Sequence, residues 1–275
     1  MECNYWKKTK PGGNMNNYYI NDDGRVHVKQ LNLVVTSRCN LKCKQCCHLN
    51  QLRTYDGDSI EDLLYYLEKW TQRLDIQTLN IIGGEPLLLH DLPEIIRGAR
   101  AILPENNIEI WTNGTLLHEH DVLWEVCHEC RISVLISDHL KKPSNADILD
   151  RYGVCYKRAN QQTFFRFYHW GQDGLPICPN SDPAKAWMAH GKACHVRDCT
   201  AFYRNRLFQC AIHGSRVMAQ DEGILPVETW GHLTALPYMT LDNTPAEIAE
   251  YLNRIAPPEC AGCPEQQPRC NAWET

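Results

Sequence analysis

Short apolar runs alternate with amphipathic stretches over residues 31–158. The first apolar run, 31–35, predicts a strand, and residues 58–74 carry apolar side chains at helical spacing and predict a helix capped by Asp58 or Ser59. The same patterns predict further strands at 78–82, 108–111, 131–137, 154–157 and 163–168, and further helices at 91–101, 118–127 and 145–152. This βα repeat predicts a parallel sheet of about six strands, too few for an eight-stranded barrel.

The βα pattern ends after Trp170. Residues 171–185 are rich in Gly, Pro, Asn and Asp and predict a loop or linker. Residues 200–212 predict a hairpin that turns near Asn205, a residue type that tolerates positive φ, and residues 245–255 predict one more helix. We therefore expect three parts, which are an N-terminal extension (1–29), a core domain (30–185) and a C-terminal domain (186–275).

The composition indicates a globular chain with an unusual number of thiols. Of 275 residues, 43% are apolar and 22% are charged, which is ordinary for a soluble domain. The net charge of −5 without a basic block predicts no nucleic-acid partner, and no apolar run is long enough to span a membrane. The first ten residues lack the apolar core of a signal peptide, so a cytoplasmic location is expected. There, most of the 15 cysteines should be reduced and available for metal binding or chemistry.

Three of these cysteines follow the first predicted strand at close spacing. Cys39, Cys43 and Cys46 form a C-x3-C-x2-C pattern. Three thiolates on a tight loop can bind three corners of a cubane iron–sulfur cluster and leave the fourth iron open to a substrate or cofactor. A zinc site with His48 or Cys47 as the fourth ligand has the same spacing, so the pattern alone does not decide between them.

A second motif closes the next predicted strand. It reads Gly83-Gly84-Glu85-Pro86. Two glycines let the backbone approach a ligand closely, and Glu85 offers a carboxylate to an ammonium group. Alone, the motif would indicate an ordinary glycine turn with a solvated Glu85. Its occurrence together with the three cysteines favours the cluster over zinc.

The two motifs together resemble those of the radical S-adenosylmethionine (SAM) superfamily, and the resemblance extends over nearly the whole chain. It implies a partial (β/α)6 TIM-like barrel in which Cys39, Cys43 and Cys46 hold a 4Fe–4S cluster that chelates the methionine part of SAM. The cofactor-binding residues that it implies are Gly83, Gly84, Glu85, Asn113 and Ser137. One departure is Gln45 before the third cysteine, where family members often have an aromatic residue.

The C-terminal cysteines resemble the auxiliary-cluster region called SPASM or Twitch. The resemblance implies a second 4Fe–4S cluster, and the shorter Twitch form fits best because only Cys270 follows the CxxC pair. Asn205 takes the hairpin position that is usually glycine. The implied ligands are Cys194, Cys210, Cys260 and Cys263, with Cys199 and Cys270 as alternates. Cys199 is also a candidate hydrogen donor to a substrate radical, whereas Cys127 and Cys130 are interpreted as structural.

The implied chemistry is reductive cleavage of SAM to a 5′-deoxyadenosyl radical, which abstracts a hydrogen atom from an unactivated C–H bond. We expect a sugar-like or aminocyclitol-like small molecule that is oxidised or epimerised, a layout similar to radical SAM aminocyclitol dehydrogenases. The alternatives are a maturase of a ribosomally made peptide and a non-catalytic zinc protein. The expected electron donor is a flavodoxin or ferredoxin. His48, and Arg166 or Tyr168, are candidates for contact with substrate or SAM.

Overall fold

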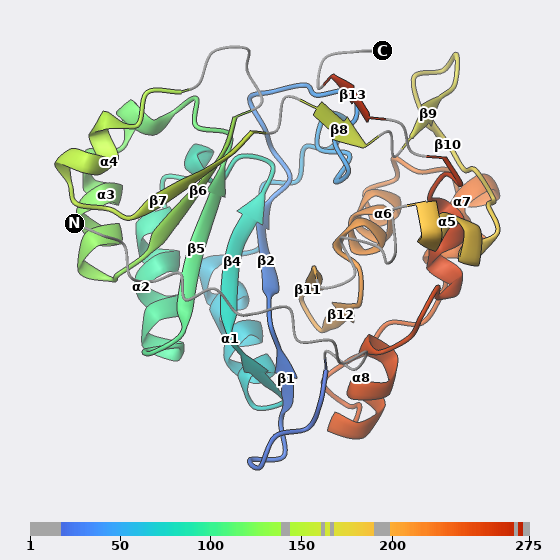
Figure 1. Ribbon diagram of the computed structural model, residues 1–275, viewed down its shortest axis with the longest axis horizontal. Coiled ribbons are helices and arrows are strands. Elements are labelled where there is room, and N and C mark those ends of the chain that lie inside the picture. Colours follow the sequence, from blue (N-terminus) through green and yellow to red (C-terminus); the bar gives the residue numbers. More distant parts are fainter. Residues whose placement is uncertain are drawn as a thin grey trace.

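The computed structural model describes residues 18–138, 144–160, 163–165, 168–189, 199–266 and 269–271. Its centre is a seven-stranded sheet in the order β12-β11-β2-β4-β5-β6-β7, in which every neighbouring pair is parallel except β11 with β12 (Figure 1). The strands are β2 (Leu31–Thr36), β4 (Thr78–Gly83), β5 (Asn107–Thr112), β6 (Ser133–Asp138), β7 (Tyr156–Asn160), β11 (Thr200–Tyr203) and β12 (Arg206–Phe208). The predicted α/β class with a mostly parallel sheet is confirmed.

Helices connect the successive parallel strands, as the βα repeat predicts. They are α1 (Ile60–Thr71), α2 (Leu92–Ile102), α3 (Asp121–Glu129) and α4 (Asp147–Arg151). α1 packs on α2, and α2 packs on α3 (Figure 1). Ser59 caps α1, since its hydroxyl accepts a hydrogen bond from the Asp62 backbone N–H. α1 ends three residues earlier than predicted because Leu74 begins β3 (Leu74–Ile76), which pairs with β1 (Val26–Val28).

The sixth parallel strand is not the one that the sequence pattern indicates. β8 (Thr163–Phe165) lies outside the main sheet and pairs antiparallel with β13 (Arg269–Asn271). The backbone groups of β8 are thus paired with a C-terminal strand rather than with β7. Instead, β11 pairs in parallel with β2 and extends the sheet at its other side.

The chain from His169 onward contains more regular structure than the sequence predicts. Besides β11 and β12, it forms β9 (His169–Trp170), β10 (Pro176–Ile177), α5 (Pro183–Ala189), α6 (Ala211–Asp221), α7 (Val227–Thr234) and α8 (Pro245–Leu252). The described residues also contain three short 3-10 helices, η1 (Pro86–Leu88), η2 (Leu117–Glu119) and η3 (Pro258–Gly262). The loop expected at 171–185 therefore includes β10 and the start of α5. α8 begins where predicted, in a capping box made by Thr244 and Glu247.

The hairpin β11–β12 turns where predicted, but through a different residue. Arg204 adopts the left-handed conformation, with φ at 53°, and Asn205 does not. Asn205 contributes in another way, because its side-chain oxygen accepts a hydrogen bond of 2.9 Å from the Leu241 backbone N–H. This contact ties the turn to the segment before α8.

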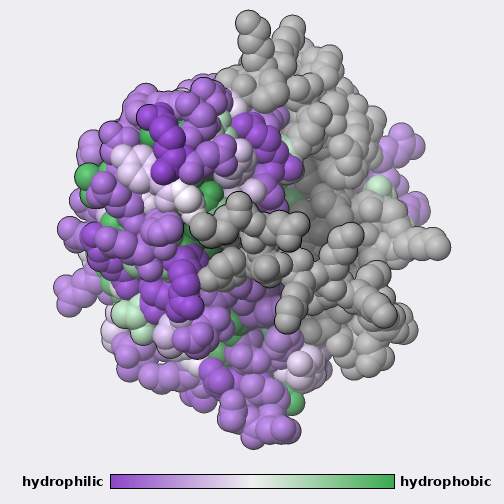
Figure 2. Space-filling view, turned by 60° about the vertical axis from the view of Figure 1, so that its left-hand side comes forward, coloured by the Kyte–Doolittle hydropathy of each residue, from purple (hydrophilic) through white to green (hydrophobic). Residues whose placement is uncertain are grey.

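Two hydrophobic clusters hold the described part of the chain together. The larger includes the sheet and α1–α3, and Phe202, Leu207 and Ile248 also belong to it, so residues beyond 186 share the main core. The smaller includes Leu49 and Trp230 and packs α6 against α7. The side of the molecule that carries α3 and α4 is mostly hydrophilic (Figure 2). Among the described residues, every helix is too short or too polar to cross a membrane.

Candidate functional site

The loop that follows β2 brings all three cysteines of the first motif to one cavity. The cavity has a volume of about 190 Å³. Its lining includes Cys39, Cys43, Cys46, Cys47, His48, Gly83, Gly84, Thr112, Asn113 and Ser137. These residues come from the carboxyl ends of β2, β4, β5 and β6, the edge at which parallel α/β sheets bind ligands.

The three thiols lie close to one another, with Cys43 buried and Cys39 and Cys46 half-buried. Burial, with a smaller contribution from the neighbouring thiols, raises the pKa of Cys39 to about 11 and that of Cys43 to about 12. The thiols are thus held where a bound cation is needed to make them thiolates. Among the described residues, no three His, Cys, Asp or Glu side chains converge on a single metal ion. A cubane does not require such convergence, because each cysteine binds a different iron, and the three-thiol donor set of this cavity fits such a cluster.

Gly83 and Gly84 let the end of β4 pack directly on the cysteine loop. A Cβ at Gly83 would lie 2.2 Å from the Thr36 carbonyl oxygen, and a Cβ at Gly84 would lie 1.9 Å from that of Arg38. The Gly84 N–H donates to the Thr36 oxygen at 2.8 Å, and the next N–H donates to the Arg38 oxygen at 2.8 Å. The close approach that the glycines permit is therefore one of backbone to backbone. Both glycines also line the cavity. Their contact with SAM stays a prediction.

Glu85 is fully buried, so the alternative of a solvated carboxylate is wrong. Its carboxylate accepts hydrogen bonds from the Thr112 hydroxyl at 2.6 Å, the Asn113 N–H at 2.7 Å and the Leu87 N–H at 3.1 Å. Burial raises its pKa to about 7, although these hydrogen bonds lower it. Glu85 is not among the residues that line the cavity. It fixes the end of β5 next to the cavity, and its contact with an amine stays a prediction.

Asn113 and Ser137 lie on the cavity wall, where the sequence places them. The Asn113 side-chain N–H donates to the Asn40 side-chain oxygen at 2.8 Å and approaches the Cys39 Sγ at 3.9 Å. Its side-chain oxygen accepts from the Thr115 N–H at 2.9 Å. The Asn113 amide is thus oriented on the cysteine loop before any ligand binds.

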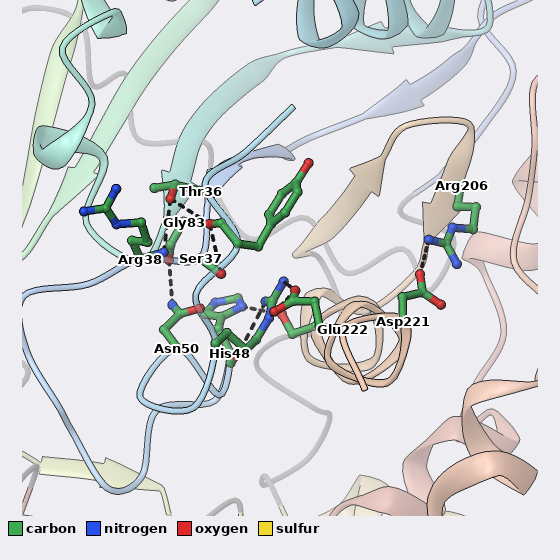
Figure 3. A network of polar contacts seen from close by, with 12 residues as sticks. Thr36, Ser37, Arg38, His48, Asn50, Gly83, Arg206, Asp221 and Glu222 are labelled. Atoms are coloured by element: carbon green, nitrogen blue, oxygen red, sulfur yellow. Dashed lines mark hydrogen bonds and ion pairs between the residues drawn. The ribbon is translucent and has the colours of Figure 1, made fainter. Parts of the chain in front are cut away.

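Three side chains of the cysteine loop anchor it to the rest of the site (Figure 3). His48 Nδ1 lies 2.7 Å from the Ser215 hydroxyl, Arg53 Nε donates to Glu222 at 2.9 Å, and the Asn50 amide donates to the Gly83 carbonyl at 2.9 Å. Burial, with a smaller effect of Arg53, lowers the pKa of His48 to about 4, so the ring is neutral at pH 7.

Ser215 lies on α6 and Glu222 is the C-cap residue of α6, a helix that the sequence pattern did not predict. Residues 211–219 are buried on every side, so the helix has no polar face and no amphipathic period. The sequence indicates this helix only weakly, by a stretch without proline after the hairpin.

Gln45 and Tyr168 connect the loop to the smaller core. The Gln45 side-chain oxygen accepts from the Tyr168 N–H at 3.3 Å, and the Tyr168 hydroxyl donates to the Cys47 carbonyl at 2.9 Å. The Tyr168 ring is buried beside Trp230. Tyr168 is therefore a structural residue in this arrangement and not an exposed substrate contact. Arg166 lies outside the described residues.

The structure brings most of the C-terminal cysteines near one another. Cys199 directly precedes β11 and Cys210 follows β12, and the Ala211 N–H donates to the Cys199 carbonyl at 3.0 Å, which joins the two ends of the hairpin. Cys260 and Cys263 lie at η3, where the Cys263 N–H donates to the Cys260 carbonyl at 2.8 Å. Burial, and then the nearby Cys263, raise the pKa of Cys210 to about 11.

The remaining C-terminal candidates are not placed. Cys194 lies outside the described residues, and Cys270 is on β13, whose side chains are not described. Cys47 lies near cysteines of both groups. Burial raises its pKa, and the nearby Cys46, Cys199 and Cys210 thiols contribute to that increase. The C-terminal thiols thus lie near the cysteine loop.

The described cysteines differ in whether they are buried in the core, free or disulfide-bonded. Cys127 is fully buried in the main core, in agreement with its structural interpretation. The cysteines of the loop, and Cys210 and Cys263 among the C-terminal candidates, are free thiols. Cys155, just before β7, is disulfide-bonded, which the expectation of reduced thiols did not anticipate.

Comparison with known proteins gives a family match over residues 33–170, just over half of the chain, to the Radical SAM superfamily. Among curated proteins, a GTP 3′,8-cyclase 2 of Mycobacterium bovis is 33% identical over 94 residues, which are 33% of this chain and 26% of that protein. A probable GTP 3′,8-cyclase of Archaeoglobus fulgidus is 36% identical over 112 residues, 40% of this chain and 36% of that protein. The chain thus matches only about a quarter to a third of the length of these relatives.

Two solved structures are similar to this chain at low sequence identity. BtrN in complex with AdoMet and 2-DOIA is 14% identical, with a TM-score of 0.49 over 86% of this chain and 91% of that one. Streptococcus suis SuiB bound to S-adenosylmethionine is 13% identical, with a TM-score of 0.39 over 68% of this chain and 61% of that one.

Proposed function

Since the chain belongs to the radical SAM superfamily, we propose that it cleaves S-adenosylmethionine reductively to a 5′-deoxyadenosyl radical. This radical abstracts a hydrogen atom from a small molecule of the sugar or aminocyclitol class and leads to its oxidation or epimerisation. The observation that carries the proposal is the cavity in which three free thiols meet the glycine motif at the carboxyl edge of the sheet. We assign the 4Fe–4S cluster that the family implies to Cys39, Cys43 and Cys46.

When bound, the cluster supplies the electron that breaks a carbon–sulfur bond of SAM. The residues of the chain prepare the place for it. Gly83, Gly84, Asn113 and Ser137 contact SAM in this proposal, and Glu85 holds the strand end that carries Asn113. The cavity of about 190 Å³ is smaller than the roughly 300–1,000 Å³ of typical ligand pockets, so SAM extends beyond it.

The fate of the substrate radical depends on the C-terminal thiols. Oxidation removes one further electron and one proton, and we assign the electron acceptor to an auxiliary 4Fe–4S cluster on Cys210, Cys260 and Cys263. The fourth ligand is Cys194, Cys199 or Cys270. Epimerisation requires a hydrogen atom from a thiol instead, and Cys199 is the candidate. The position of Cys199 at the end of the hairpin that carries Cys210, and its electrostatic effect on Cys47, support either role near the cysteine loop.

The relatives named GTP 3′,8-cyclase share only the part of the chain that carries the SAM motifs. The matched fraction of each is too small to bring their substrate to this chain. We therefore base the proposed substrate class on the expected arrangement of the chain, a core domain followed by one auxiliary cluster, which is similar to that of radical SAM aminocyclitol dehydrogenases. A flavodoxin or ferredoxin is the proposed electron donor.

The direct test uses the anaerobically reconstituted protein with dithionite and SAM. Formation of 5′-deoxyadenosine and methionine is expected in the native chain and not in a variant with Cys39, Cys43 and Cys46 all changed to alanine. Cys130→Ala is the matched control, since it removes a thiol at the end of α3 and should leave turnover intact. Equal SAM cleavage by the native chain and the triple variant would contradict the assignment.

The reaction type is tested separately, with the candidate substrate in deuterated water. One deuterium in a product of otherwise unchanged mass supports epimerisation, and loss of two mass units supports oxidation. Cys199→Ala should abolish deuterium incorporation in the first case.

A further inference from the structure

Arg216 is a buried cation on α6 for which the described residues supply no opposite charge. The residue lies on α6 and is 1% exposed. Within the described part of the chain, no carboxylate forms an ion pair with it, whereas buried Arg53 pairs with Glu222 and Arg254 pairs with Glu259. A buried charge without an opposite charge is strongly destabilising, so its surroundings should contain the compensation.

The groups around the guanidinium are thiols and aromatic rings. Its Nη2 donates to the Cys263 Sγ at 3.3 Å, and its Cζ lies 5.5 Å from the ring centroids of both Tyr168 and Trp230. The rings stabilise the cation in part. The Nε has no hydrogen-bond partner among the described residues. The contacts seen therefore leave the charge and one donor unsatisfied, next to a cysteine.

The neighbouring basic groups do not alter this balance. His213, one turn before Arg216 on α6, is buried, and burial together with the charges of Arg216 and Arg254 lowers its pKa to about 3, so it is neutral. Arg254 has its own carboxylate partner at 2.6 Å. Arg216 is thus the uncompensated cation beside these thiols in the described structure.

The CxxC turn is fitted to the guanidinium. A Cβ at Gly262 would lie 2.5 Å from Nη1 and 3.1 Å from Cζ of Arg216. Glycine between Cys260 and Cys263 therefore lets the turn pack on the charged group. This gives a second contact, independent of the hydrogen bond to Cys263, between Arg216 and the C-terminal cysteines.

We propose that Arg216 is the buried counter-charge of an anionic, thiolate-held iron–sulfur cluster on Cys210, Cys260 and Cys263, and that it raises the reduction potential of that cluster. The inference rests on the proposed function, because it assumes the auxiliary cluster. Reduction adds one electron to the cluster and no proton, since a guanidinium does not titrate. A fixed positive charge stabilises the reduced, more negative state. Arg216 is a positioning and tuning residue, and it does not contact the substrate.

The test measures the potential of the auxiliary cluster in the reconstituted full chain by redox titration with electron paramagnetic resonance. The triple alanine variant of Cys39, Cys43 and Cys46 identifies which signal belongs to the C-terminal cluster. Arg216→Gln should lower the reduced-to-oxidised ratio at a fixed potential at least tenfold, which is about 59 mV for a one-electron couple. Arg206→Gln is the matched control, since it removes a cation that pairs with Asp221 at the far end of α6, and it should leave the potential unchanged (Figure 3).

Two further variants separate charge from shape. Arg216→Lys keeps the charge and should retain most of the native potential. Gly262→Ala keeps the arginine but displaces its guanidinium from the turn, and should shift the potential in the direction of Arg216→Gln by a smaller amount. Iron content is measured for each variant, so that a changed potential is not confused with a lost cluster.

The outcomes are distinct. Loss of the C-terminal irons from Arg216→Gln but not from Arg216→Lys supports the proposal. Loss from both variants overturns it, because the shape of the arginine side chain and not its charge would then hold the cluster site. An unchanged potential in Arg216→Gln with full iron also overturns it, while the SAM cleavage activity stands. About four irons in the native chain, all lost in the triple variant, would overturn the inference by removing the auxiliary cluster, and the radical SAM function would again stand.

Discussion

Replacing Gly84 by alanine tests whether the packing of β4 on the cysteine loop holds the cavity in shape. The new Cβ would lie 1.9 Å from the Arg38 carbonyl oxygen and 2.7 Å from that of Ser37. These are backbone atoms and cannot rotate away as a side chain would. To accept the methyl group, the end of β4 and the loop must separate, and the two hydrogen bonds of 2.8 Å that Thr36 and Arg38 accept must lengthen.

The magnitude follows from these contacts. Overpacking of a tight site costs about 1–3 kcal/mol. Each weakened buried backbone hydrogen bond costs about 0.5–1.5 kcal/mol. Gly84→Ala should therefore lower the free energy of unfolding by about 2–6 kcal/mol, a large part of the roughly 5–15 kcal/mol that stabilises a typical domain.

The assay is urea unfolding followed by circular dichroism, with iron content after reconstitution as the second readout. Gly231→Ala on α7 is the control, because the nearest atom to its new Cβ is a side-chain atom of an exposed residue, Val227 Cγ1 at 3.0 Å, and not a backbone atom. Alanine there should be neutral or stabilising by up to about 1 kcal/mol. If Gly84→Ala changed the unfolding free energy by less than about 0.5 kcal/mol and kept its iron, the role given to this packing would be refuted.

Three further predictions concern contacts of the same site. The pKa of Glu85 is raised from 4.5 to about 7, so its ionisation should destabilise the fold by about 3 kcal/mol as pH rises from about 4.5 to 7; Glu85→Gln should remove that part of the pH dependence of unfolding, and an unchanged slope would contradict the burial argument. Arg53→Met should cost about 3 kcal/mol because it leaves Glu222 unpaired, and adding Glu222→Gln should recover part of it; strictly additive losses would show that the pair does not interact. Ser215→Ala should cost about 1 kcal/mol in urea unfolding by removing the partner of His48, without loss of iron; a loss of iron would assign Ser215 a larger role in holding the loop.

The parallel sheet was predictable because its strands and helices alternate in a regular way. β2, β4, β5, β6 and the first helices lie within a few residues of their predicted ranges, and Ser59 caps α1. The addition of β11 to β2 was not predictable from local pattern, since it pairs segments about 170 residues apart. The same holds for β8, whose partner is β13 at the other end of the chain.

The parts of the site that belong to sequence motifs were predictable. The parts that depend on which side chains are buried were not. The spacing of the cysteines and the glycine motif led to residues that do meet at one cavity. The sequence did not show that Glu85 is enclosed by its own hydrogen bonds, or that α6 is buried on all sides. A helix that contains His213, Ser215 and Arg216 in its interior has the composition of an exposed segment, so its polar contacts with the cysteines appear only in the folded chain.

The most direct test of the account is iron and acid-labile sulfide per chain after anaerobic reconstitution, in the native protein and in the variant with Cys39, Cys43 and Cys46 changed to alanine. Each cubane holds four irons, so the account predicts about eight in the native chain and about four in the variant. The same iron content in both proteins would show that these three cysteines hold no cluster, and would contradict the central assignment.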